Sequence, residues 1–141
     1  MKHVALAILF MASLNAQIAF TTVLKGESSG EETARQVVVR TQAEWQALWK
    51  VHAPDQNAKL PAVDFSTKMV IGVFLGTKPS AGYDVEIVGV RTQEKELLVE
   101  YVETQPGRGT MAAQILTEPF HLVAVNRHAG DVRFVHGPAK K

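Results

Sequence analysis

Alternating apolar and polar residues predict strands along most of the chain. Residues 68–75 form an almost unbroken apolar segment, typical of a strand buried on both faces, whereas alternation from Tyr83 to Ile87 is typical of a strand with one solvent face. Frequent strands without helices between them favour antiparallel pairing, so we predict an all-β, antiparallel, sandwich-like single domain with one helix. The other predicted strands, each bounded by turn residues, are residues 18–25, 35–40, 97–104, 119–126 and 132–135.

The single helix is predicted to start after Thr41. In the segment TQAEWQALW, Thr41 and Glu44 form a capping box, because each side chain can bond a backbone amide at the other residue. Trp45, Leu48 and Trp49 follow at helical spacing and give the helix an apolar face. We expect this face to pack across the sheet, and an aromatic ligand-binding box is the alternative.

The first residues have the pattern of a secretory signal. A short basic start precedes the apolar run 4–14, which suits a signal core but is too short to span a bilayer. Ala16 and Ala19 are the candidate residues before the cleavage site, and the alternatives are an uncleaved anchor or a first strand of the domain. We therefore predict a signal peptide at residues 1–19 with cleavage near 16–19, a domain at 20–137 and a tail at 138–141.

This pattern predicts export to the periplasm or secretion, with no stable membrane span after cleavage. The composition agrees with a self-sufficient domain, since 46% of the 141 residues are hydrophobic and 21% are charged. The net charge is +1, and loss of Lys2 with the leader leaves 14 basic residues against 14 acidic ones. Because the basic residues are also scattered, we predict no nucleic-acid partner.

Candidate catalytic motifs lack the context that their chemistry needs. Gly26 to Gly30 match the G-x-S-x-G pattern around Ser28, but a β-branched run follows instead of the helix of a nucleophile elbow. Asp64 is best explained as a local cap before Phe65. We therefore predict no enzyme activity, and an enzyme that uses Ser28 or a histidine site is the competing class.

The histidines show no metal-ligand spacing, and the chain has no cysteine. His121 lies between Phe120 and Leu122, so we expect a solvated or hydrogen-bonded surface histidine. The glycines of PGRGT lack the lysine and helix of a phosphate loop. We predict no metal site and no cofactor.

Four segments together resemble one known family. The helix AEWQALW, the segment VDFSTKMVIGVFLG, the loop GTKPSAGY with its following strand, and the late TEPFHLVAV resemble the PrcB C-terminal domain family, named for a subunit of a surface protease complex. The likeness extends from about Phe20 to Val135. It implies a small, exported, β-rich accessory domain with no catalytic residues and no cofactor.

Three loops also resemble those of chagasin-type cysteine-peptidase inhibitors. The comparable segments are KPSAGY, PGRG and EPF, which occur in the same order with similar spacing. The sequence departs from the inhibitor pattern at Ser80 and Ala81, where threonines are expected, at Glu118 in place of arginine, and at Phe120 in place of tryptophan. The resemblance implies peptidase inhibition as an alternative function.

We expect a non-enzymatic accessory module that binds a protein partner, either a protease or an envelope complex. Loops held by rigid strands commonly carry binding function, and we expect the three loops to converge at one end of the sandwich. A structural envelope protein is a third class. The predicted partner-binding residues are Lys78, Pro79, Ser80, Ala81, Gly82 and Tyr83, supported by Gly107, Arg108 and Phe120.

Overall fold

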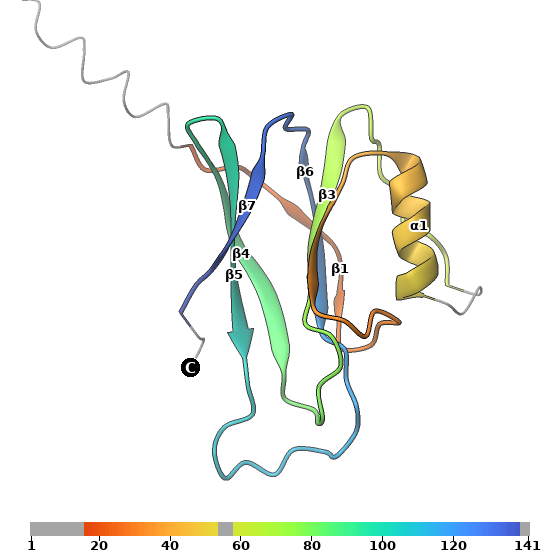
Figure 1. Ribbon diagram of the computed structural model, residues 1–141, viewed down its shortest axis with the longest axis vertical. Helices are drawn as coiled ribbons and strands as arrows, with labels where there is room; N and C mark the ends of the chain where they lie inside the picture. The colour runs from red at the N-terminus through yellow and green to blue at the C-terminus, as the bar shows by residue number, and fades with distance from the viewer. Residues whose placement is uncertain (1–15, 54–57, 139–141) are drawn as a thin grey trace, which may run out of the picture.

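The computed structural model describes residues 16–53 and 58–138, so most of the predicted signal peptide, part of the predicted loop after the helix, and the last three residues lie outside it. Two sheets face each other, and one helix covers the outer face of the larger sheet (Figure 1). The elements are β1 (Thr21–Gly26), β2 (Arg35–Val39), α1 (Gln42–His52), β3 (Lys68–Phe74), β4 (Asp84–Gln93), β5 (Glu96–Thr104), β6 (Phe120–Asn126) and β7 (Val132–His136).

The fold is the predicted all-β sandwich with one helix. The larger sheet has the order β1-β6-β3-β2, and the smaller has the order β4-β5-β7. Every neighbouring pair is antiparallel except β5 and β7, which are parallel. The parallel pair departs from the antiparallel prediction. After β5 the chain crosses to the larger sheet, where it forms β6, and it then returns to the smaller sheet as β7, which runs in the same direction as β5.

Two apolar clusters form the core, one on each face of the larger sheet. The first lies between the sheets and includes Ile71, Ile87 and Val99. The second lies between the larger sheet and α1, where Trp45 is fully buried. Because β3 contributes side chains to both clusters, it is buried on both faces. This burial explains its continuous apolar pattern, as predicted.

The start of α1 confirms the predicted capping box. The Glu44 amide donates to Thr41 Oγ1 at 3.1 Å, and the Thr41 amide donates to Glu44 Oε1 at 3.2 Å. Trp45 and Leu48 are buried, and Trp49 is half-buried, so the helix packs on the sheet as expected. Asp64 also has the predicted local role, since its carboxylate accepts from the Ser66 amide at 3.0 Å. The Ser66 hydroxyl, which donates to the same carboxylate at 2.6 Å, and the Ser66 amide hold the pKa of Asp64 below its ordinary value.

Residues just before β1 lie along β4 of the other sheet. The Ile18 amide donates to the Val90 carbonyl at 2.8 Å, and the Thr92 amide donates to the Ala16 carbonyl at 2.8 Å. Ile18 is half-buried and packs against the cluster between the sheets. Residues 16–18 therefore contact the smaller sheet ahead of β1, and the domain boundary at residue 20 stays a prediction. Within residues 16–53 and 58–138, no helix is long and apolar enough to cross a membrane.

Candidate functional site

Two long loops meet at one end of the sandwich, and we call residues 75–83 and 105–119 together the loop end. The first loop joins β3 to β4, and the second joins β5 to β6 (Figure 1). Lys78 and Thr117 form a two-way backbone bridge, with N to O distances of 2.7 and 3.0 Å. The Ala81 amide adds a third bond, to the Ala113 carbonyl at 3.0 Å. The segments KPSAGY, PGRG and EPF therefore lie at one end of the sandwich, in two loops that are fastened to each other rather than in three separate ones.

The predicted segment KPSAGY forms part of this surface and part of its support. The Lys78 ammonium lies 5.4 Å from the centre of the Tyr83 ring, within cation–π range, and both side chains are half-buried. Pro79 and Gly82 are exposed, and Ala81 is half-buried. These residues are accessible to a partner, and their binding role stays a prediction.

Ser80 supports the loop end from inside. Ser80 is only 8% exposed, and its backbone carbonyl accepts from Thr117 Oγ1 at 2.9 Å. Gly82 has a φ of 97°, and a Cβ there would lie 3.0 Å from Pro106 Cγ. Glycine is thus required both by the backbone conformation and by the close approach of the second loop.

Of the three predicted supporting residues, two are exposed and one is buried. Gly107 and Arg108 are exposed on the second loop. Phe120 is only 3% exposed, and it stacks on Phe74 with ring centres 6.0 Å apart. Its ring is part of the core beneath α1, so Phe120 offers no side-chain surface to a partner. The chagasin-type resemblance therefore lacks an exposed aromatic residue at its third loop.

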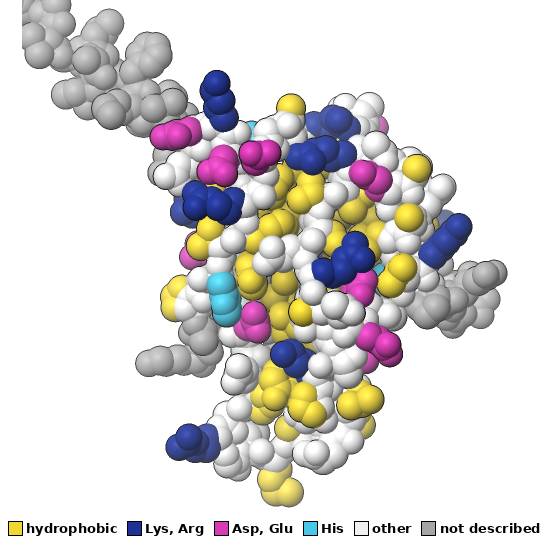
Figure 2. Space-filling view, viewed as in Figure 1, with side chains coloured by type: hydrophobic (Ala, Val, Ile, Leu, Met, Phe, Trp, Pro, Cys, Tyr) yellow, Lys and Arg dark blue, Asp and Glu magenta, His cyan; other side chains and the backbone are white. Residues whose placement is uncertain are grey.

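The most exposed apolar side chains of the loop end were not among the predicted site residues. Met111 is 99% exposed, Leu116 is 71% exposed and Ile115 is 58% exposed. Figure 2 shows hydrophobic side chains gathered at the lower end of the molecule, where the second loop lies in Figure 1. The segment TMAAQIL carried a detectable signal, because its apolar residues fit neither a strand nor a helix bounded by turns.

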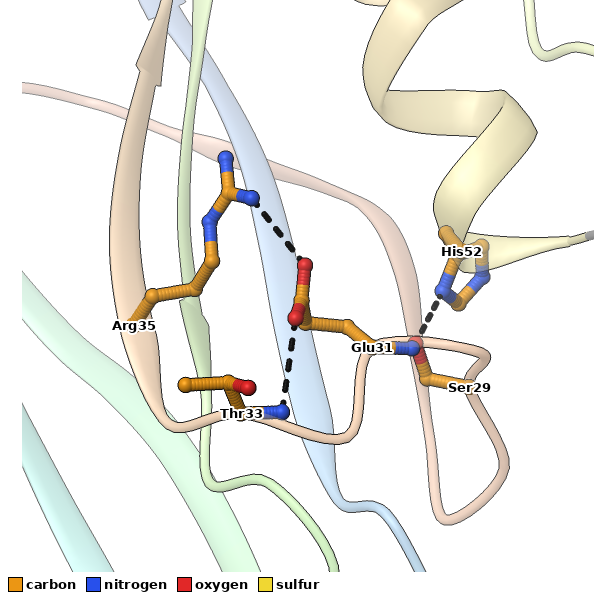
Figure 3. Close-up of polar contacts among 5 residues, drawn as sticks. All are labelled: Ser29, Glu31, Thr33, Arg35 and His52. Carbon is orange, nitrogen blue, oxygen red and sulfur yellow. Dashed lines mark hydrogen bonds and ion pairs between the residues drawn. The ribbon is translucent and has the colours of Figure 1, made fainter.

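Ser29, the neighbour of the serine candidate, forms a structural contact with His52 at the end of α1. Ser28 of the elbow-like motif is exposed, whereas its neighbour Ser29 is buried and lies 2.8 Å from His52 (Oγ to Nδ1, Figure 3). Ser29 Oγ also accepts from the Glu31 amide at 3.0 Å. The Gly30 amide donates to the His52 carbonyl at 2.7 Å. Together these bonds tie the loop between β1 and β2 to the last turn of the helix.

This serine–histidine pair lacks the arrangement of a catalytic triad in the described part of the chain. The buried Glu31 carboxylate points away from His52 and bonds Arg35 at 3.0 Å and the Thr33 amide at 3.3 Å (Figure 3). His52 packs edge-on against Phe120, with ring centres 4.4 Å apart. Burial lowers the pKa of His52, so the neutral imidazole is favoured. The geometry supports packing and loop attachment rather than nucleophilic catalysis.

His121 is a bonded histidine inside the sandwich, not a solvated one on its surface. It is 3% exposed because β6 is covered on both faces. Its Nδ1 accepts from the Ile87 amide of the other sheet at 2.9 Å, which leaves Nε2–H to donate to Thr22 Oγ1 at 2.9 Å. Burial, together with the nearby Lys25 charge, lowers the pKa of His121. His121 is therefore a neutral link between the two sheets.

Residues 16–53 and 58–138 contain no group of three histidine, aspartate or glutamate side chains placed to hold a metal ion. The fold and the fastened loops define a small β-sandwich module with an apolar surface at one end. Residues 69–126 match the family model described as PrcB C-terminal, which confirms the predicted family resemblance over β3 to β6 and the loop end. No curated protein and no solved structure matches the chain.

Proposed function

We propose that this chain is an exported, non-enzymatic accessory domain that binds a protein partner through the loop end. The partner that the family resemblance favours is a component of a protease complex. The observation that carries the proposal is the exposure of Met111, Ile115 and Leu116 on loops that are fastened to each other.

The exposed side chains supply a driving force for association. Complete burial of a methionine, isoleucine or leucine side chain contributes about 1.5–3 kcal/mol. The fastened loops also reduce the conformational entropy that binding would otherwise cost. Around the apolar side chains, Lys78 and Arg108 provide charged groups, and backbone groups of the loops provide hydrogen bonds, as in the polar rim of protein interfaces.

Affinity capture from the organism's own cell envelope tests this proposal. The expected result is recovery of a protease-complex component by the unaltered domain and loss of that component with Leu116→Asp. Val88→Asp is the matched control, because Val88 is 42% exposed on β4 outside the loop end. Equal recovery with both variants would contradict binding through the loop end.

Peptidase inhibition is the second candidate, and the close approach of Gly82 in KPSAGY to Pro106 in PGRG is the observation that favours it. Titration of a papain-type cysteine peptidase with the domain tests it directly. Inhibition that is lost with Tyr83→Ala would support this function, and full peptidase activity at a large excess of the domain would exclude it.

Export with removal of the leader is part of the proposal. Ile18 packs against the core, so cleavage after Ala16 preserves this contact, whereas cleavage after Ala19 removes it. We therefore expect the mature chain to start at Gln17. Intact-mass measurement of the envelope fraction checks this, and full-length protein found only in the cytoplasm would contradict export.

A further inference from the structure

A groove runs between the edge strand β2 and the helix α1, away from the loop end. Its volume is about 480 Å³, and it is lined by all of β2 and by Glu44, Ala47, Leu48 and Val51 of α1. Val51 is 45% exposed there, one of the few large apolar side chains that the described residues leave open to solvent. The groove therefore combines an apolar wall with one side of a strand.

The backbone of β2 limits what can fill this groove. Among the strands of the described residues, β2 pairs only with β3, so the amides and carbonyls of alternate residues face the groove rather than a neighbouring strand. An extended peptide pairs with such an edge through its main chain, and it then places alternate side chains against the helix. Ala47, Leu48 and Val51 offer an apolar surface to those side chains.

From this arrangement we propose that β2 and α1 bind an extended peptide segment of a partner, which adds a fifth strand to the larger sheet. All pairs in this sheet are antiparallel, so the peptide runs antiparallel to β2 and its carboxyl end lies near Arg35. The side chains that face α1 are apolar.

The charges at the two ends of the groove specify the peptide further. The Arg35 side chain is 47% exposed, and one of its guanidinium nitrogens pairs with Glu31 at 3.0 Å, so its other donors can bond a second carboxylate. Glu44 lies at the opposite end, beside the last residue of β2, where its carboxylate accepts from the Arg40 amide at 2.8 Å. An acidic residue toward the peptide's carboxyl end and a basic residue toward its amino end complement this pair.

A second copy of this chain is a poorer occupant than a peptide. Antiparallel pairing of two β2 edges around a two-fold axis keeps both helices on the same face of the joined sheet. Since α1 lines the groove beside β2, the second helix would enter the space that the first one borders. A single strand without a helix avoids this conflict.

Selection of random heptapeptides displayed on phage against the full chain tests the proposal. We expect enriched sequences with apolar residues at alternate positions and an acidic residue near the carboxyl end. A synthetic copy of the enriched peptide should lose about tenfold or more in affinity with Val51→Glu. It should bind Val88→Glu and Leu116→Asp as it binds the unaltered chain, which separates this groove from the loop end.

Methylation of the peptide's backbone amides tests whether its main chain pairs with β2. Copies of the peptide that are N-methylated at successive positions should lose affinity at every second position, because only alternate amides face β2. The proposal is overturned if no peptide is enriched, if Val51→Glu and Val88→Glu bind equally, or if N-methylation has no periodic effect. A dimer in sedimentation that Val51→Glu dissociates would also overturn it and assign the edge to a second copy.

Discussion

The core beneath α1 and the loop end contain similar side chains in opposite environments. Trp45 and Leu122 are fully buried, whereas Met111 and Leu116 are largely exposed. Apolar residues of the first kind stabilise the fold, because folding removes them from water. The exposed apolar residues of the loop end contribute little to folding, and a bound partner would remove them from water. The comparison separates the residues that stabilise the domain from those that we propose bind its partner.

The core should show the largest loss of stability on truncation. Trp45→Ala removes a fully buried ring whose Nε1 donates to the Pro61 carbonyl at 2.9 Å. We expect a loss of about 3–5 kcal/mol in the free energy of unfolding. Trp49→Ala should cost less, because Trp49 is half-buried. Urea denaturation checks both variants, and equal midpoints for them would contradict the assignment of Trp45 to the centre of the core.

Two glycines with similar backbone conformation sharpen the comparison. Gly76 has a φ of 76°, and an added Cβ would lie 2.7 Å from the Ala34 amide nitrogen. Gly109 has a φ of 79°, with nothing within 4 Å of an added Cβ. Both alanine variants carry the cost of the left-handed conformation, about 1–2 kcal/mol. Gly76→Ala should lose a further amount of about 1–3 kcal/mol through the clash. Equal thermal midpoints would show that the loop between β1 and β2 moves aside easily.

His121, which links the two sheets, should make the free energy of unfolding depend on pH. The pKa of His121 is lowered in the folded state from an ordinary value of about 6.5. Above that value the histidine is neutral in both folded and unfolded states, and its full contribution is present. As pH falls toward the lowered pKa, the unfolded state takes up the proton first, so stability decreases.

Denaturant midpoints between pH 7.5 and pH 5 measure this effect. The denaturant midpoint of His121→Gln should decrease less steeply than that of the unaltered chain over the same interval. Part of the remaining decrease comes from His52, whose pKa is also lowered by burial. Identical slopes would mean that His121 is not the neutral link that its bond to Ile87 indicates.

The fold could be predicted from sequence where local pattern decides the structure. The apolar run at residues 68–75 and the capping box at Thr41 both specify their elements without distant contacts. The parallel placement of β7 and the burial of His121 depend on which strands become neighbours, and periodicity carries no such information. The position of His121 between Phe120 and Leu122 predicts a surface histidine on the opposite strand face, whereas both faces of β6 are covered.

The candidate site was predictable in position but not in its most exposed residues. Gly82 and Pro106 marked tight loops, and the fold brings them together. Met111, Ile115 and Leu116 lie outside every predicted strand and helix, and sequence alone does not separate an exposed apolar residue from a core one. The Ser29–His52 contact joins two segments whose proximity depends on the packing of α1. Exposure and contact at these positions require the three-dimensional arrangement.

One variant tests the central claim most directly, that the loop end binds and does not stabilise. Met111, Ile115 and Leu116 are replaced together by serine, and both unfolding free energy and envelope-partner capture are measured. We expect the free energy to stay within about 0.5 kcal/mol per substitution, as for surface positions, while capture of the partner is lost. Unchanged capture, or a loss of stability as large as that of Trp45→Ala, would contradict the account.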